Sequence, residues 1–138
     1  MQTFLPLPDY AESARVLDRA RLGKQRVECL QIAHALVGTR SGWRNHPAVK
    51  MWRGYTNSLI LYGFAICKEW QSRGYSDTCY VKLAKLYGIH KDLTMPSFPD
   101  AFHASHRSNL LRKDPDWYGQ FGWTEPNNLE YVWPISEK

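Results

Sequence analysis

The chain has 138 residues, of which 43% are hydrophobic and 14% aromatic, and its formal net charge is +5 at pH 7. This length suits one compact domain, so we expect a single domain over residues 1–138. No apolar run is long enough to cross a membrane and the first residues do not resemble a secretion signal, which favours a soluble, cytoplasmic protein. The three cysteines are widely spaced, and therefore indicate neither a disulfide framework nor a zinc site.

The first third of the chain predicts a helical run with one interruption. Asp9 and Glu12 have the spacing of a capping box and open a helix near residue 10. Gly23 is expected to kink or split this helix. Beyond it, Gly38 ends a run whose buried side is defined by residues at helical intervals, namely Val27, Leu30, His34 and Val37. Glu28 lies one residue from the first of these, about 100° around the helix, and so at the edge of the buried side.

The remainder of the chain also reads as helices joined by loops. A loop over residues 39–45 leads to a helix start at residues 45–47, where a proline occupies the first turn. A helix is predicted over residues 56–73, ended by Gly74, from an apolar stripe at Leu59, Gly63, Ile66 and Trp70. A further helix is expected over residues 78–87 and a short one after Asp100. The tail from Pro115 should be irregular. The predicted fold is therefore mainly α: a compact helical bundle with an irregular, aromatic-rich C-terminal tail.

Cationic side chains fall into three stretches, each close to aromatic residues. The first stretch precedes Glu28 and contains Arg15, Arg19, Arg21, Lys24 and Arg26. The second contains Arg40, Arg44, Lys50 and Arg53, with Trp43 and Trp52. The third contains His103, His106, Arg107, Arg112 and Lys113, with Phe102, Trp117 and Tyr118. Cations position phosphates and aromatic faces can receive a displaced base, so this pattern favours nucleic-acid binding over scattered surface charge.

Two features bear on the chemistry of a possible site. Glu28 is the only carboxylate near the end of the first cationic stretch, which makes it a candidate for acid–base chemistry. His103 and His106 are three residues apart, but no carboxylate or cysteine lies at a matching spacing, so we expect hydrogen-bond or phosphate roles rather than metal binding. Neither a metal nor an organic cofactor is expected.

Four blocks of the sequence resemble the bacteriophage endonuclease V family. They are RLGKQRVECL (21–30), NHPAVKMW (45–52), FHASHR (102–107) and WYGQFG (117–122). They occur in the family's order over nearly the whole chain. Members of this family are small helical pyrimidine-dimer DNA glycosylases with an associated abasic-site lyase activity. The resemblance therefore implies a DNA repair enzyme of the same fold and reaction class.

The resemblance also implies a mechanism. In this family the α-amine of the first residue attacks C1′ of the damaged nucleotide, the base leaves from the resulting imine, and β-elimination can cut the strand. Glu28 takes the place of the family's helix glutamate, which stabilises charge at the sugar and shuttles protons. Arg21, Lys24 and Arg26 would hold the phosphates beside the lesion. The duplex would be kinked, with a base extruded.

The N-terminus departs from the family pattern. The family exposes the amine of a small residue after the initiator Met is removed, whereas Gln2 is bulky and favours retention of Met1. Met1 is therefore the expected nucleophile, with Lys24 in reserve and water as a third route. Val27 stands where the family has a further arginine. The expected DNA-facing residues are Arg19, Arg21, Arg26, Arg44, His46, Lys50, Arg53, His106, Arg107, Arg112, Lys113, Trp117 and Tyr118. For the last two, Trp117 and Tyr118, the alternative is that they close the core beneath the lesion.

The expected partner is duplex DNA with a damaged or modified base, bound by a monomer that associates with the nucleoid when it is on DNA. Two other functions fit the sequence. One is a glycosylase for a different modified base, and the other is a non-catalytic nucleic-acid-binding protein of the same fold.

Overall fold

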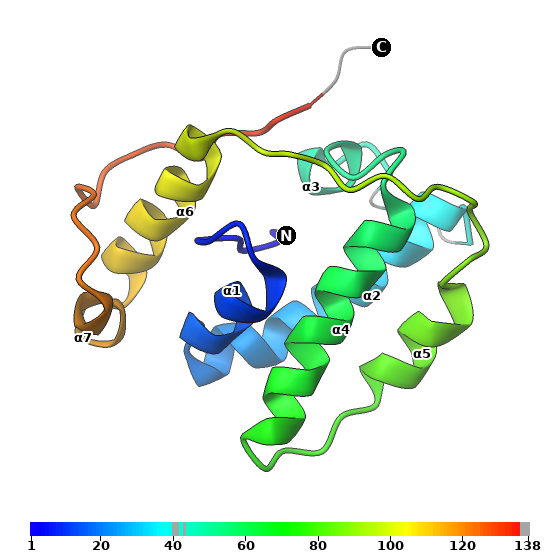
Figure 1. The fold of residues 1–138 in the computed structure, drawn as a ribbon, viewed down its shortest axis with the longest axis horizontal. Coiled ribbons are helices and arrows are strands. Elements are labelled where there is room, and N and C mark those ends of the chain that lie inside the picture. The colour runs from blue at the N-terminus through cyan, green and yellow to red at the C-terminus, as the bar shows by residue number, and fades with distance from the viewer. Residues whose placement is uncertain (40–41, 43, 136–138) are drawn as a thin grey trace.

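The computed structural model describes residues 1–39, 42 and 44–135. All regular structure in these residues is helical, which confirms a mainly α fold (Figure 1). In chain order the elements are α1 (Tyr10–Val16), α2 (Arg19–Val37), α3 (Pro47–Lys50), α4 (Thr56–Ser72), α5 (Cys79–Leu86), α6 (Asp100–Lys113), α7 (Pro115–Tyr118) and the 3-10 turn η1 (Gly119–Phe121). Within the described residues no helix is both long enough and apolar enough to cross a membrane.

The break in the first helical run lies before α2, and not at Gly23 as predicted. Asp9 caps α1 by accepting a hydrogen bond from the backbone N of Glu12 at 2.8 Å, as its spacing indicated. Asp18 then caps a new helix by accepting one from the backbone N of Arg21. Gly23 lies inside α2, where an added Cβ would be 2.9 Å from the ring of Trp70. This glycine therefore permits close helix packing and does not interrupt the helix.

The buried face of α2 is rotated relative to the predicted one. Val27 is 46% exposed, so it does not belong to the buried side. The residues that face the interior are Leu22, Gln25, Glu28, Cys29, Ile32, Ala33 and Ala35. Glu28 therefore lies within the buried face and not at its edge. Gly38 ends the helix in the left-handed conformation, with φ of 83°, as expected.

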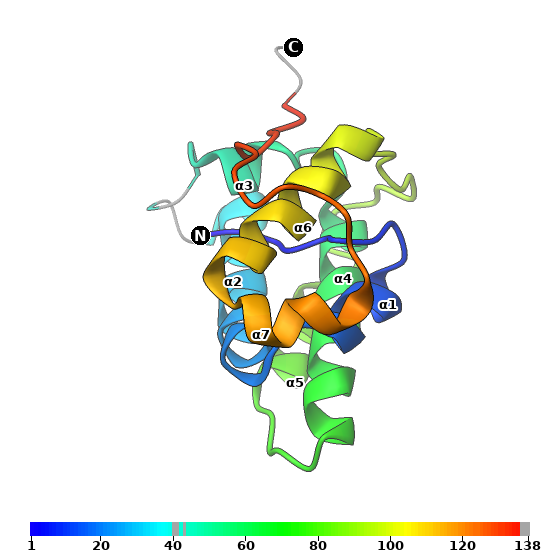
Figure 2. The ribbon, with the colours of Figure 1, turned by 90° about the vertical axis from the view of Figure 1, so that its left-hand side faces the viewer.

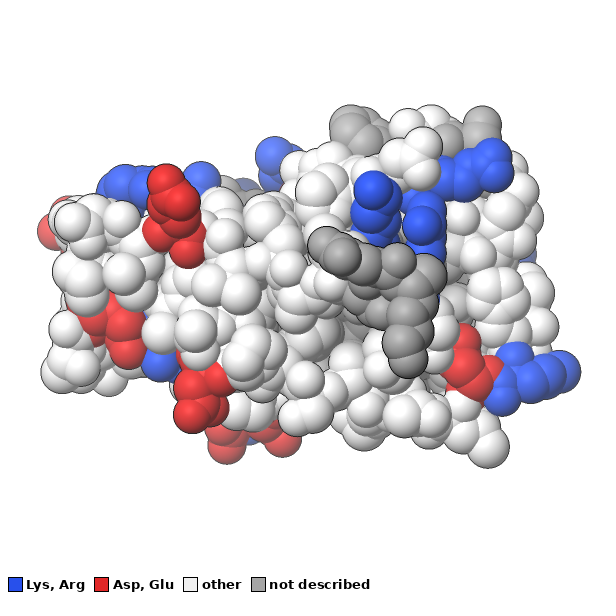
Figure 3. Space-filling model, turned by 90° about the horizontal axis from the view of Figure 1, so that it is seen from above, with Lys and Arg blue, Asp and Glu red and all other residues white. Residues whose placement is uncertain are grey.

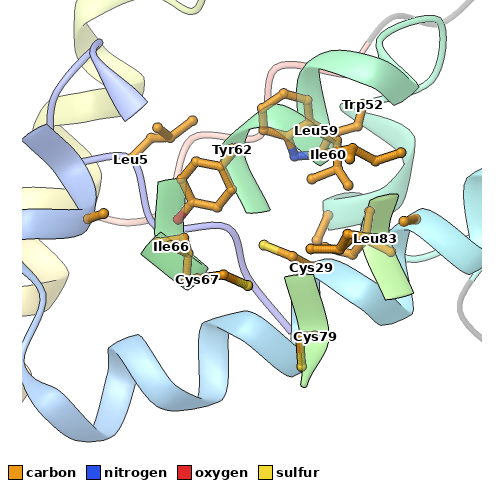
Figure 4. Close-up of a cluster of buried hydrophobic side chains, with 14 of the residues drawn as sticks. Leu5, Cys29, Trp52, Leu59, Ile60, Tyr62, Ile66, Cys67, Cys79 and Leu83 are labelled. Atoms are coloured by element: carbon orange, nitrogen blue, oxygen red, sulfur yellow. The ribbon is translucent and has the colours of Figure 1, made fainter. Parts of the chain in front are cut away.

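A first layer of the molecule is an apolar cluster of four helices, α1, α2, α4 and α5. Figure 4 shows its interior, where Tyr62 and Ile66 of α4 lie near Cys29 of α2 and Leu83 of α5. The three cysteines are buried free thiols, which agrees with their spacing in the sequence. The observed ends of α4 and α5 lie within one residue of the predicted ends. The prediction was accurate here because an apolar stripe and a glycine after the last turn mark these helices clearly.

A second layer contains α6, which is longer than predicted, with 14 residues. Residues 1–7 cross the molecule without regular structure, between α6 and the four-helix layer (Figures 1 and 2). After η1 the tail is irregular, as expected, and runs back beside α6. Unlike the first layer, α6 buries mostly polar side chains, namely His103, Ser105, His106, Ser108 and Asn109. It thus lies between two irregular segments of the chain and provides hydrogen bonds to both.

Candidate active site

The N-terminal amine and the carboxylate of Glu28 lie side by side in the interior. The nitrogen of Met1 is 3.7 Å from Oε2 of Glu28, and the backbone N of Gln2 donates a hydrogen bond to the same oxygen at 2.9 Å. The side chain of Met1 is 3% exposed and that of Glu28 is 12% exposed. A basic nitrogen and a carboxylate are therefore held together between side chains that are mostly buried, an arrangement suited to proton transfer.

Gln25 of α2 holds the first residues in place. Its Oε1 accepts a hydrogen bond from the backbone N of Phe4 at 2.9 Å, and its Nε2 donates one to the carbonyl of Gln2 at 2.6 Å. The hydroxyl of Tyr62, from α4, donates to the carbonyl of Phe4. These bonds replace the backbone partners that an irregular segment lacks. They thereby help to fix the position of the amine of Met1.

Two histidines of α6 hold the next peptide. His103 Nδ1 donates to the carbonyl of Leu5 at 2.7 Å, and the backbone N of Leu5 donates to His106 Nδ1 at 2.9 Å. The arrangement requires a proton on Nδ1 of His103 and none on Nδ1 of His106. His106 is fully buried, and burial, followed by the proximity of His103, lowers its pKa to about 3. The prediction that His106 faces DNA is wrong, because its ring is inside the protein.

A cavity of about 420 Å³ opens beside the amine and carboxylate. It is lined by Met1, Gln2, Phe4, Ala20, Arg21, Lys24, Glu28, Lys113, Tyr131 and Trp133. Burial, together with the nearby Arg21, Arg112 and Lys24, lowers the pKa of Lys113. Cations from α2 and α6 are therefore close enough to repel one another, and an anionic ligand would relieve this repulsion.

His46 borders the same region. Its Nδ1 accepts a hydrogen bond from the backbone N of Ala48 at 3.0 Å, so it caps α3. Burial lowers its pKa, and so does the ammonium group of Met1, whereas the charge of Glu28 acts in the opposite direction. The first and third cationic stretches of the sequence thus bring Arg21, Lys24 and Lys113 near the amine, whereas His46 lies within the span of the second stretch without being one of its cations.

Other predicted DNA-facing residues serve the fold instead. Arg26 pairs with the buried carboxylate of Asp77 at 2.6 Å. Arg107 pairs with Glu125 at 2.8 Å and also donates to the carbonyl of Pro6. Because both guanidinium groups already have internal partners, neither is suited to hold a phosphate.

Tyr118 is likewise internal, because its side chain is completely buried and its hydroxyl bonds to the carboxylate of Asp18. Of the two expected roles of Tyr118, contact with DNA is therefore wrong, and closure of the core agrees with its burial. Trp117 is half-exposed, and its indole N donates to the carbonyl of Val16 at 2.7 Å.

The remaining predicted contacts stay predictions. These residues are exposed or half-buried and do not line the cavity: Arg19, Arg44, Lys50, Arg53, Arg112 and Trp117. Arg40 and Trp43 of the second stretch lie outside the described residues. Figure 3 shows that Lys and Arg on one face of the molecule lie mostly along one edge, whereas Asp and Glu lie mostly away from it. Such separation of charge is typical of a surface that binds a polyanion.

Several residues of this region were not identified from the sequence. Gln25 is a buried polar residue on a helix, and nothing in its local sequence distinguishes it from an exposed glutamine. Tyr131 and Trp133 lie in an irregular tail, for which periodicity gives no orientation. Among the described residues, no group of three or more His, Cys, Asp and Glu side chains is arranged to hold a metal ion.

A family model described as pyrimidine dimer DNA glycosylase matches residues 1–83. The match covers more than half of the chain and includes Met1, Lys24, Glu28 and His46, but it ends before α6. No curated protein and no solved structure matched the chain.

Proposed function

Because this chain belongs to the pyrimidine dimer DNA glycosylase family, we propose that it breaks the glycosidic bond of one pyrimidine of a dimer in duplex DNA and then cleaves the strand at the resulting abasic sugar through an imine. The observation that carries the proposal is the distance of 3.7 Å between the nitrogen of Met1 and Oε2 of Glu28, at the edge of a cationic cavity. Nucleophile, acid–base group and phosphate-binding side chains thus share one site, as this reaction needs.

The amine of Met1 is the proposed nucleophile. At neutral pH a larger fraction of α-amines than of lysine side chains is unprotonated, and the neutral form attacks carbon. Lys24 lines the same cavity but is exposed, whereas the amine of Met1 is close to a carboxylate that can accept its proton. Attack at C1′ forms the C–N bond, the glycosidic bond breaks, and the base leaves with a proton. Opening of the sugar ring gives the imine.

Glu28 has two proposed roles in these steps. Its negative charge stabilises the positive charge that develops at the sugar while the base leaves. After the imine has formed, its carboxylate takes the proton from C2′, the C3′–O bond breaks, and the strand is cut. The hydrogen bond from Gln2 to Oε2 keeps the carboxylate oriented during both steps. Water then hydrolyses the imine and restores the amine.

The cations of the cavity are proposed to hold the phosphates on either side of the reacting nucleotide. Arg21 and Lys24 lie on α2 and Lys113 at the end of α6, so they approach the cavity from two elements. Contacts of this kind release counterions from DNA, and binding should therefore weaken steeply as salt is raised.

The test is borohydride trapping on UV-irradiated and unirradiated duplexes of the same sequence. Borohydride reduces an imine to a stable amine, and mass spectrometry of the digested adduct identifies the nitrogen. We expect an irradiation-dependent adduct at the amine of Met1. The matched variant is Lys24→Arg, which keeps the positive charge but removes the reserve amine, and it should form the adduct as well as the wild type.

Each other result changes the proposal in a defined way. An adduct at Lys24 would move the nucleophile and keep the reaction. Trapping on a duplex with another modified base, but not on irradiated DNA, would change the substrate. If the protein bound DNA but gave neither base release nor an adduct, the proposed enzymatic activity would be wrong. A non-catalytic DNA-binding protein would then be favoured.

A further inference from the structure

Two aromatic residues of the C-terminal tail, Tyr131 and Trp133, form part of the cavity wall. They lie about fifty residues beyond the segment that the family model matches, which ends at residue 83. The cavity is thus composed of two parts. The reactive groups, Met1 and Glu28, come from the matched segment, and the aromatic wall comes from the part of the chain that the family model does not reach.

The backbone of the tail is fixed to α6 beside this wall. The backbone N of Leu129 donates to Ser108 Oγ at 2.9 Å, and Asn109 donates to the carbonyl of Leu129 at 3.0 Å. The backbone N of Val132 donates to Ser105 Oγ at 3.2 Å. Together, these bonds hold the ring of Tyr131 at a defined place in the cavity.

Both rings are also supported by histidines. The ring of Tyr131 meets that of His106 edge to face, with centroids 5.5 Å apart. The ring of Trp133 meets that of His46 in the same way at 6.1 Å. The centroids of Tyr131 and Trp133 are 6.0 Å apart. The two rings are therefore neighbours, and the elements that support them, α6 and the start of α3, also surround the amine of Met1.

The lining of the cavity matches the chemistry of one nucleotide. A nucleotide has an aromatic base, a sugar and an anionic phosphate. For the base, the cavity provides the rings of Phe4, Tyr131 and Trp133. For the phosphate, it provides the cations of Arg21, Lys24 and Lys113. Its volume of about 420 Å³ lies in the range of ordinary ligand sites. An unpaired base that leaves the duplex loses its stacking partners, and aromatic side chains can replace them.

We propose that Tyr131 and Trp133 stack on an extruded base of the bound DNA, so that the C-terminal tail holds this base in the site. This inference rests on the proposed function. Replacing a stacking aromatic by alanine in proteins that bind unpaired strands typically weakens binding by about fivefold or more. The tail wall should therefore matter whenever a base has to be held, and should not matter when the base is absent.

The test compares two substrates with one set of variants. Breaking the glycosidic bond in an irradiated duplex, called base release below although the base stays joined to its neighbour in the dimer, needs the base to be held. Cleavage of a preformed abasic site does not. We expect Trp133→Ala to slow base release by about fivefold or more and to leave abasic cleavage within about twofold of the wild type. Trp133→Phe keeps an aromatic face and should retain most of the rate. Tyr87→Ala, at an exposed tyrosine beyond α5, is the matched control and should change neither rate.

An equal loss on both substrates would overturn the inference, because it would mean that Trp133 only positions the amine through His46. No loss of rate on either substrate would overturn the inference as well.

A wild-type protein that acts on neither substrate would refute the proposed function instead, and stacking is then tested by binding alone. A duplex with one unpaired 2-aminopurine should be more fluorescent in complex with Trp133→Ala than with the wild type, and equal fluorescence would exclude stacking. Thermal unfolding of each variant checks that it is folded.

Discussion

The two layers of the molecule are stabilised in different ways. The helices α1, α2, α4 and α5 bury apolar side chains against one another, and burial of this kind is not directional. On α6, by contrast, most of the buried side chains are polar, and they bond to the irregular residues 1–7 and to the tail. Hydrogen bonds have defined distances and angles. The first layer therefore provides a scaffold, and the second positions the groups that surround the cavity.

The largest expected effect is at Glu28, where the two layers meet. Glu28→Gln removes the negative charge, but its amide oxygen can still accept the hydrogen bond from Gln2. We expect base release and strand cleavage to fall by about 10²–10⁴-fold, with DNA affinity at fixed salt and the melting temperature little changed. Single-turnover kinetics beside a binding titration measure both. Glu12→Gln, at an exposed position of α1, is the control. An active Glu28→Gln protein would contradict the assigned role.

A substitution that creates an empty space in the apolar layer should lower the stability of the protein and leave its activity unchanged. Leu59 of α4 is fully buried, and Leu59→Ala should lower the free energy of unfolding by about 2–5 kcal/mol because its methyl groups leave unfilled space. Urea unfolding gives this value. The trapping rate per folded molecule should stay that of the wild type. A large loss of trapping in folded Leu59→Ala protein would show that the two layers are not separable.

Loss of the hydrogen bonds that hold residues 1–7 should disturb the candidate active site instead. Gln25→Leu leaves the backbone N of Phe4 and the carbonyl of Gln2 without their bonds to Gln25, at about 1–3 kcal/mol for each buried group left unpaired. Because residues 1–7 can detach locally, we expect faster hydrogen exchange there and slower trapping, while α4 and α5 keep their protection. Gln31→Leu on the same helix is the control. Uniformly faster exchange over the whole protein would contradict a local effect.

The last expected effect is a pH dependence caused by His106, which is small just below about pH 6.5 and grows as the pH falls. Its folded-state pKa of about 3 lies below the unfolded value, so the unfolded state binds one more proton over the interval between them. This contribution to stability is complete above about pH 6.5 and falls by about 1.4 kcal/mol per pH unit as the pH decreases toward the folded value. His106→Asn keeps an acceptor near the position of Nδ1 but does not titrate.

Urea unfolding at pH 7, 6, 5 and 4 measures this slope. Asp18, Asp77 and Glu125 also have lowered pKa values and lose stability in acid, so the relevant quantity is the difference between wild type and variant. Parallel curves for wild type and His106→Asn would show that His106 is not held neutral in the fold.

The sequence predicted the apolar layer better than the polar one. Asp9, Gly38 and Gly74 marked helix ends because capping and left-handed turns depend on local residue type. The break before α2 was missed because Asp18 was counted among the charges and not as a cap. The length of α6 was missed because its buried face is polar, and hydrophobic periodicity cannot detect such a face.

The candidate site followed the same division. The charge pattern made Glu28 a candidate, and the resemblance added its role and Met1. Periodicity placed Glu28 at the edge of a helix face in whose interior it lies. His106 and Tyr118 were assigned to the surface because histidine and tyrosine are common at DNA interfaces. Their burial depends on partners about a hundred residues away in the chain, Leu5 and Asp18, which no local pattern reveals.

The bonds of Leu5 to α6 also set an order of events during synthesis. Its partners His103 and His106 follow it by 98 and 101 residues, so they leave the ribosome long after it does. At typical elongation rates of about 5–20 residues per second, the N-terminal segment waits several seconds for them. The helices α1 to α5 can pack in that time, since their contacts are more local. Residues 2–4 can bond to α2 and α4 early, whereas Leu5 gains its partners only when α6 has been made, so one of the residues made first is among the last to complete its contacts.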